Sequence, residues 1–240
     1  MLNKTCQMRQ RIITLTPLFF FTFFSVLAIP VAYSEENLPL LMPHDEAERD
    51  ESLLAFRARM LQVLAFKEPE RLIEMIDPKM SNGLNAKRGA RAFVELWRPE
   101  TIDSKIWEIL SPILKLGGGF VRSESGVMFC APYVFVNFPA ELDVFSHGVV
   151  IQENVSLYQN PTTASTILTK LNYNILQVDD WRSVSDDSGT ESLQWIKVST
   201  MDDKEGYVQR KYIRSPSDYS ACFIQRKNKG WKLSSLVSGN

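Results

Sequence analysis

The sequence contains few of the side chains from which catalytic and metal sites are usually built. Among its 240 residues are only three cysteines and two histidines. A closed zinc site takes four cysteine, histidine or carboxylate ligands, and a Cys–His nucleophile needs a matched pair of side chains. We therefore expect no metal site, no cofactor and no catalytic residue, and we predict that the protein is not an enzyme.

The chain also lacks a strong excess of charge of either sign. Its 27 basic and 28 acidic residues give a formal net charge of -1 at pH 7, so there is no basic field to attract nucleic acid. A phosphate-binding loop is absent too. The run Gly117-Gly118-Gly119 is not followed by Gly-Lys-Ser/Thr and no predicted strand precedes it, which favours a helix end and a turn.

One long apolar run is present, close to the N-terminus. Three basic residues precede an apolar stretch from Ile12 to Val31, and the small-x-small ending Ala32-Tyr33-Ser34 follows it. This order is typical of a secretory signal peptide. We expect residues 1–34 to be a signal peptide and the protein to be exported, to the periplasm or the extracellular space. An uncleaved membrane anchor is the alternative, because the run approaches the length that spans a bilayer.

Export would bring two cysteines into an oxidising environment, in which disulfides form. Cys130 and Cys222 follow the signal segment, and both lie in strand-like apolar runs. If the two strands are neighbours, a disulfide can form. Otherwise the two thiols are buried and behave as small hydrophobic groups. The sequence leaves both outcomes open.

The first half of the chain carries helical signals after a proline-rich, acidic linker at residues 35–46. Apolar residues at helical spacing predict four helices. The first begins near Asp45, and the others run from Pro69 to Ile76, from Ala90 to Trp97 and from about Ser104 to Leu116. Pro112 predicts a kink or a break in the last helix. Strands are predicted at Phe120-Val121 and over Val127–Phe138, where Pro132 indicates a sheet edge or a bulge.

The C-terminal residues predict a β-hairpin. Strand-like runs at Tyr219–Gln225 and Trp231–Val237 flank the turn residues Asn228-Lys229-Gly230. An isolated hairpin is only marginally stable in water. We therefore expect it to pair with the strand at Val127–Phe138, with a contact between Phe129–Phe135 and Phe223 or Trp231.

Between Gly148 and Ser215, short β-branched runs alternate with turn residues, which predicts a small barrel. Four motifs follow one another there: Asn154-Val155 with Asn160-Pro161, the run Thr166–Leu171, the run Trp195–Val198, and Gly206-Tyr207-Val208 ahead of Tyr212-Ile213. In this order they resemble a bacterial SH3 (SH3b) domain. Two features depart from that pattern: Tyr158 stands where the family usually has arginine, and a long polar loop lies between Trp181 and Leu193.

These observations together predict an α+β fold: an N-terminal helical domain completed by antiparallel strands, plus an inserted small SH3-like β-barrel. The α+β domain would comprise residues 47–145 with 216–240, and the SH3-like barrel residues 146–215.

The resemblance implies a non-catalytic module of the cell envelope that binds a wall peptide or a protein partner. Its ligand groove would be edged by Tyr158, Trp181, Tyr207 and Tyr212, unless these rings only pack. Trp195 is expected in the core. The expected partner is a peptidoglycan peptide or an envelope protein. We expect no nucleic acid, and contact with the membrane only through an uncleaved N-terminal segment.

Two other functions stay open. In a structural or assembly protein, the helical domain would supply the interaction surface. An envelope peptidoglycan hydrolase is favoured less. Its nucleophile and base would have to be Cys130 and His147, but Cys130 lies in an apolar strand rather than at a helix start, where a thiolate is stabilised.

Overall fold

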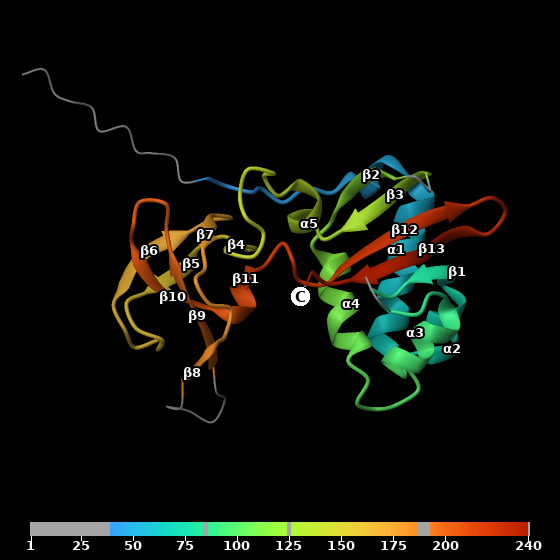
Figure 1. Ribbon diagram of the computed structural model, residues 1–240, viewed down its shortest axis with the longest axis horizontal. Coiled ribbons are helices and arrows are strands. Elements are labelled where there is room, and N and C mark those ends of the chain that lie inside the picture. The colour runs from blue at the N-terminus through green and yellow to red at the C-terminus, as the bar shows by residue number, and fades with distance from the viewer. Residues whose placement is uncertain (1–38, 84–85, 124–125, 187–192, 240) are drawn as a thin grey trace, which may run out of the picture. The chain divides into compact units, whose positions relative to one another are not determined.

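The computed structural model describes residues 39–83, 86–123, 126–186 and 193–239 (Figure 1). The predicted signal peptide and the first residues of the predicted linker lie outside these ranges. The described chain mixes helices with mostly antiparallel strands, so the α+β class is confirmed at this level. Its strands form two sheets, and each sheet has a hydrophobic cluster of its own.

The first sheet has five strands in the order β1-β13-β12-β3-β2. They are β1 (Ile76–Ser81), β2 (Gly119–Ser123), β3 (Gly126–Ala131), β12 (Ser220–Arg226) and β13 (Gly230–Val237). β1 pairs with β13 in parallel, and the other neighbours are antiparallel. The C-terminal hairpin β12–β13 thus lies inside a sheet whose other strands all precede the second sheet in the chain.

The predicted contact of the C-terminal hairpin is confirmed. Phe223 on β12 lies opposite Phe129 on β3, and their ring centroids are 6.5 Å apart. One residue along the same ladder, Cys222 lies opposite Cys130, and the two sulfurs form a disulfide. Of the two outcomes that the sequence left open for these cysteines, the strand register therefore selects the disulfide over two separate buried thiols.

Helices pack against this first sheet. They are η1 (Glu46–Arg49), α1 (Glu51–Phe66), α2 (Pro69–Glu74), α3 (Ala90–Trp97) and α4 (Ile106–Lys115). Asp50 caps α1, because its carboxylate accepts the N–H of Leu53 at 3.0 Å. The predicted helix at Ala90–Trp97 is confirmed residue for residue, and Pro112 lies inside α4.

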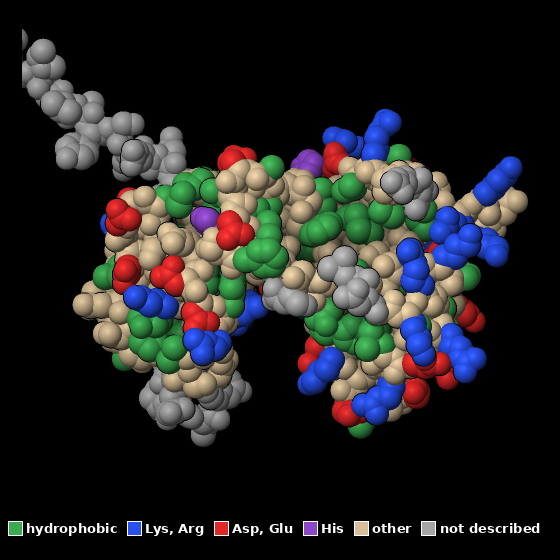
Figure 2. Space-filling view, viewed as in Figure 1, with side chains coloured by type: hydrophobic (Ala, Val, Ile, Leu, Met, Phe, Trp, Pro, Cys, Tyr) green, Lys and Arg blue, Asp and Glu red, His purple; other side chains and the backbone are tan. Residues whose placement is uncertain are grey.

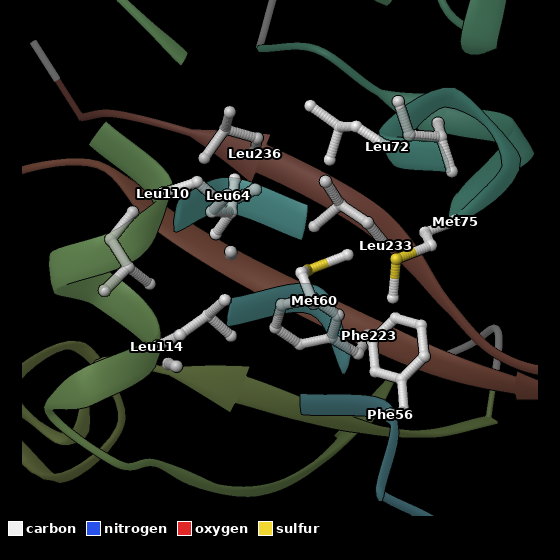
Figure 3. Packing of buried hydrophobic residues seen from close by; sticks show 14 of the residues in the cluster. Phe56, Met60, Leu64, Leu72, Met75, Leu110, Leu114, Phe223, Leu233 and Leu236 are labelled. Carbon is white, nitrogen blue, oxygen red and sulfur yellow. The ribbon is translucent and has the colours of Figure 1, made fainter. Parts of the chain in front are cut away.

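The core between helices and sheet is made of large apolar side chains (Figure 3). Phe56 on α1 meets Phe223 edge-on, with ring centroids 5.7 Å apart. Met60 and Leu110, from α1 and α4, lie in the same cluster as Leu233 on β13. Their burial is what stabilises the helices, since short helices are marginal on their own.

The predicted helix from Pro69 to Ile76 is wrong at its end. The helix α2 stops at Glu74, and Ile76–Ser81 forms the edge strand β1. A residue before proline is pushed out of the helical region, so Asp77 ahead of Pro78 favours an extended chain. Asp77 is then held in the sheet by the Arg226 guanidinium, 2.6 Å from its carboxylate.

The predicted strand over Val127–Phe138 is also wrong beyond Ala131. Strand β3 ends there, and residues Tyr133–Asn137 form the short helix α5 after a cis Ala131–Pro132 peptide bond. Pro132 has no N–H to donate to the ladder, which explains why pairing stops. The apolar residues after it are buried in another way: Tyr133 and Val134 enter a small cluster with Val149 and Ile175.

The second sheet is entirely antiparallel and runs in the order β11-β4-β7-β9-β10-β5-β6, with β8 pairing on β9. Its strands are β4 (His147–Val150), β5 (Val155–Tyr158), β6 (Ile167–Leu171), β7 (Ile175–Gln177), β8 (Val184–Asp186), β9 (Leu193–Ser199), β10 (Glu205–Gln209) and β11 (Ile213–Arg214).

This second sheet differs from the sequence prediction in two details. Within the described residues, no ladder joins β6 to β11, so the strands do not close into a barrel. Part of the predicted polar loop is the strand β8, in which Val184 lies opposite Trp195 on β9; the rest of that loop, residues 187–192, lies outside the described residues. The segment ahead of the first helix also contacts this sheet, since Ile175 donates to the carbonyl of Pro39 at 2.8 Å.

Candidate functional site

Alternation along three neighbouring strands creates two different faces on the second sheet. Side chains on one face are fully buried in its core: Val155, Leu157, Ile196, Val198 and Val208. Because successive residues of a strand point to opposite sides, their neighbours Tyr158, Trp195, Tyr207 and Gln209 share the other face. We call these four side chains, on β5, β9 and β10, the aromatic face.

Register brings these residues together. Tyr207 lies opposite Tyr158, and Gln209 lies opposite Trp195. The Tyr158 ring meets the Trp195 ring edge-on at a centroid distance of 5.3 Å. Trp195 is fully buried, as the sequence predicted. It is buried on the aromatic face, however, and not among the residues of the sheet's main cluster.

A glycine allows β5 and β10 to approach at this point. A Cβ on Gly206 would lie 2.7 Å from the carbonyl oxygen of Tyr158 and 2.9 Å from the Leu157 side chain. A backbone oxygen cannot move aside easily, so a larger residue would push the strands apart. Gly206 belongs to the motif Gly206-Tyr207-Val208, and in the structure its role is a close contact between strands.

A small polar cavity of about 150 Å³ opens beside the aromatic face. Tyr158 and Tyr212 line it together with Gln209. The remaining lining residues come from the start of β5 and the segment before it: Gln152, Asn154, Val155 and Ser156. The cavity therefore offers phenol, amide and hydroxyl groups, which can bind a peptide through hydrogen bonds and stacking.

The four residues predicted to edge a groove do not all meet here. Tyr158 and Tyr212 line the same cavity, and Tyr207 lies opposite Tyr158. Trp181 instead turns to the segment before β4, where its indole N–H donates to the Phe145 carbonyl at 2.9 Å. The Arg210 guanidinium lies over the Trp181 ring in a cation–π contact, 5.5 Å from the ring centre. Trp181 is thus placed as a packing and hydrogen-bonding residue.

Sequence reasoning missed the polar members of the cavity. Ser156 alternates with the buried Val155 and Leu157, so the period of two could have placed it beside Tyr158. Gln209 stands in the same relation to Val208 on β10. Gln152 and Asn154 carry no periodic signal, because they lie in the turn before β5.

Two polar atoms on the aromatic face lack hydrogen-bond partners among the described residues. They are the indole nitrogen Nε1 of Trp195 and the amide oxygen Oε1 of Gln209, both buried. Leaving a buried polar group unpaired costs about 1–3 kcal/mol. A ligand that bonds the Gln209 amide would recover part of this free energy.

Charged groups border the aromatic face. The Lys197 ammonium lies 2.7 Å from the Glu205 carboxylate; this hydrogen bond and the carboxylate charge raise the pKa of Lys197. On the other side, Lys170 donates to the Ser156 hydroxyl at 2.8 Å. These charges are exposed and add little to stability, but they would meet the polar ends of a bound chain.

The residues considered for hydrolysis are not arranged for it. Cys130 is bonded to Cys222, and a disulfide sulfur is not a thiolate nucleophile. His147 lies at the start of β4, where Nδ1 is 2.9 Å from the Asp143 carbonyl oxygen and 3.2 Å from the Ser146 hydroxyl. The pair proposed from the sequence therefore cannot act as nucleophile and base while the disulfide is intact.

Neither a metal centre nor a membrane span is found in the part of the chain that the structure describes. No group of three or more histidine, cysteine or acidic residues there could hold a metal ion. Nor does any helix in the described ranges have the length and apolar character needed to cross a bilayer.

The chain was compared with known proteins in three ways. It matched no protein-family model, no curated protein and no solved structure.

Proposed function

We propose that this is an exported, non-catalytic protein of the cell envelope, whose second sheet is an SH3-like module that binds a peptide from the cell wall or from an envelope protein. The support is the order of the sequence motifs over residues 146–215 and the apolar stretch near the N-terminus. The disulfide Cys130–Cys222 fits this proposal, since such bonds persist in oxidising compartments.

One observation carries the binding role: the aromatic face keeps two partly exposed tyrosines, and a polar cavity lies beside it. Tyr158 and Tyr207 are only partly buried on β5 and β10, and Tyr212 closes the cavity's edge. Partly exposed tyrosines offer large contact area with little conformational entropy to lose, which suits peptide binding.

The experiment is co-sedimentation of the purified protein with cell-wall sacculi, and with a soluble extract of envelope peptides as competitor. We expect Tyr212→Ala to weaken binding roughly tenfold, as removal of an aromatic contact residue often does. The matched control is Phe66→Ala, which removes a ring that is 71 % exposed at the end of α1. Equal binding by both variants would contradict the proposal.

A second candidate function, an assembly protein, is favoured by an apolar cleft elsewhere. A cavity of about 650 Å³ is lined by Phe135, Phe138 and Leu142 from α5 and the segment after it, and by Val237 of β13. Phe145, also in its wall, is 58 % exposed, and Figure 2 shows hydrophobic side chains on the surface around α5, β2 and β3. Here Phe145→Ser would abolish chemical cross-linking to an envelope partner, while Tyr212→Ala would leave it intact.

A further inference from the structure

A third cavity, with more charged lining residues, lies between α4 and the second sheet. Its volume is about 600 Å³, within the range of small-molecule sites. The residues that line it are Pro112, Lys115, Leu116, Ile151, Gln194, Gln209, Arg210, Lys211, Ile213 and Arg214. Four of these are cationic, and none of the described lining residues is acidic.

The positive charge around this cavity is poorly compensated. Arg210 reaches one carboxylate, that of Asp218 at 3.3 Å, which also accepts the N–H of Ser215. Within the described residues, Lys115, Lys211 and Arg214 form no ion pair. Lys211 lies over the Tyr212 ring instead, 4.8 Å from its centre. Among the described residues, the Asp218 carboxylate is therefore the one acidic partner of a cluster of four cationic side chains.

The shortage of acidic partners affects Arg214 most. It donates to the carbonyl of Tyr219, but its Nε atom is buried and has no partner among the described residues. Burial lowers the pKa of Arg214; Asp218 offsets part of this, and the nearby Arg210 guanidinium adds to it. Since an arginine keeps its charge in proteins, the protein holds a desolvated cation beside another cation.

Such an arrangement is costly unless an anion is bound. A buried charged N–H without a partner destabilises the fold, and two guanidinium groups repel each other. An oxyanion would supply acceptors in the geometry that a guanidinium prefers, and would neutralise both arginines. The apolar lining residues Leu116, Ile151 and Ile213 would meet an apolar part of the same molecule.

We propose that this cavity binds an organic anion, with a phosphate or carboxylate group held by Arg214, Lys115 and Lys211 and an apolar body against Leu116, Ile151 and Ile213. The helix α4 ends at Lys115, so its dipole presents a negative end here, and the Lys115 ammonium counteracts it. Because the site stands on charge and burial alone, it does not depend on the peptide-binding role.

The test is ligand binding to the purified full chain, measured by calorimetry and by thermal unfolding at fixed ionic strength. Phenyl phosphate, benzoate and inorganic phosphate serve as probes, and benzyl alcohol is the neutral control. We expect saturable binding of an aromatic anion and a raised Tm, with no effect of benzyl alcohol. Tighter binding of phenyl phosphate than of benzoate would assign a phosphate ligand, and the reverse order a carboxylate.

Variants locate the site. Lys115→Gln and Lys211→Gln should each weaken binding about tenfold, because each variant removes one charge-assisted hydrogen bond to the anion. The matched control Lys227→Gln, in the exposed turn after β12, should leave affinity unchanged. Arg214→Lys keeps the positive charge but loses the paired N–H groups of the guanidinium, so it should weaken binding more than either lysine variant does.

The two lysine variants also guard against misfolding at Arg214, because both residues lie at the cavity's rim and form no ion pair within the described chain. Loss of affinity with an unchanged Tm of the free protein would support the site. Absence of saturable binding by every anion, or equal affinity in the lysine variants and Lys227→Gln, would overturn the proposal.

Discussion

The two sheets differ in what covers them. Helices α1 and α4 pack on the first sheet, and Phe223 and Leu233 at their interface are at most 1 % exposed. In the second sheet, Tyr158 and Tyr207 on the aromatic face stay partly exposed. Fully buried side chains contribute stability, whereas partly exposed ones are free to contact a ligand. Three experiments would break or sharpen this comparison.

The largest expected effect is on the covered sheet. Phe223→Ala removes a ring that contacts both Phe56 and Phe129, and should lower the free energy of unfolding by about 3–5 kcal/mol. Tyr207→Ala, the matched change on the aromatic face, should cost about 1 kcal/mol. Urea unfolding followed by circular dichroism measures both. Equal losses would show that the two faces are covered alike.

The disulfide lies in the first sheet and closes a loop of the chain that contains the second sheet. Cys130 and Cys222 are 92 residues apart, and the strands β4 to β11 of the second sheet all lie within the loop that they close. Removing the bond frees that long loop in the unfolded state, so the double variant Cys130→Ala with Cys222→Ala should lose about 3 kcal/mol.

Urea unfolding with and without reductant gives the control for this prediction. The natural protein should lose similar stability when it is reduced, while the double variant should not respond to reductant. A loss below about 1 kcal/mol would mean that the loop is already constrained by packing between the sheets.

The smallest effect depends on pH and concerns the edge strand of the first sheet. Burial alone would raise the pKa of Asp77, but hydrogen bonds from Arg226 and from the Lys79 N–H outweigh it, so the pKa is lowered from its ordinary value of 3.8. A lowered pKa in the folded state means that this carboxylate stabilises the protein above pH 3.8. That contribution is lost as the pH falls through the folded-state pKa.

We expect Asp77→Asn to cost about 1–2 kcal/mol at neutral pH, a figure reduced because Arg226 is partly exposed. Its stability should then fall less steeply than that of the natural protein when the pH is lowered below about 4. Glu48→Gln, an exposed change on η1, is the control. Parallel acid curves for the natural protein and Asp77→Asn would contradict the proposed ion pair.

Local patterns predicted most of the elements. Helical spacing between Gly89 and Pro99 defined α3, because amphipathic periodicity and a following proline leave little choice. The C-terminal hairpin was equally clear, since Asn228 and Gly230 both adopt the left-handed conformation that its turn needs. The helix predicted to reach Ile76 and the strand predicted to continue past Tyr133 were both wrong near a proline. At both places, the elements that pack against the segment decide its conformation.

The candidate site was predicted only in part, for a similar reason. The SH3b resemblance placed Tyr158 and Tyr207 at the predicted groove, and register sets them opposite each other. Trp181, also predicted at the groove, donates to the Phe145 carbonyl, a partner 36 positions away in the chain that no local pattern indicates. The cationic cavity had no signal at all, since Lys115 on α4 and Arg214 on β11 are far apart in sequence.

What the sequence determined by itself was local: where helices and strands begin, which side chains alternate, and which chemistry is scarce. The tertiary structure alone decided the strand register and the contacts between residues far apart in the chain. Register joined Cys130 to Cys222, and folding gathered four cations around one cavity. The physical reason is that periodicity encodes which face of an element is apolar, whereas partners distant in sequence are chosen by the burial of those faces together.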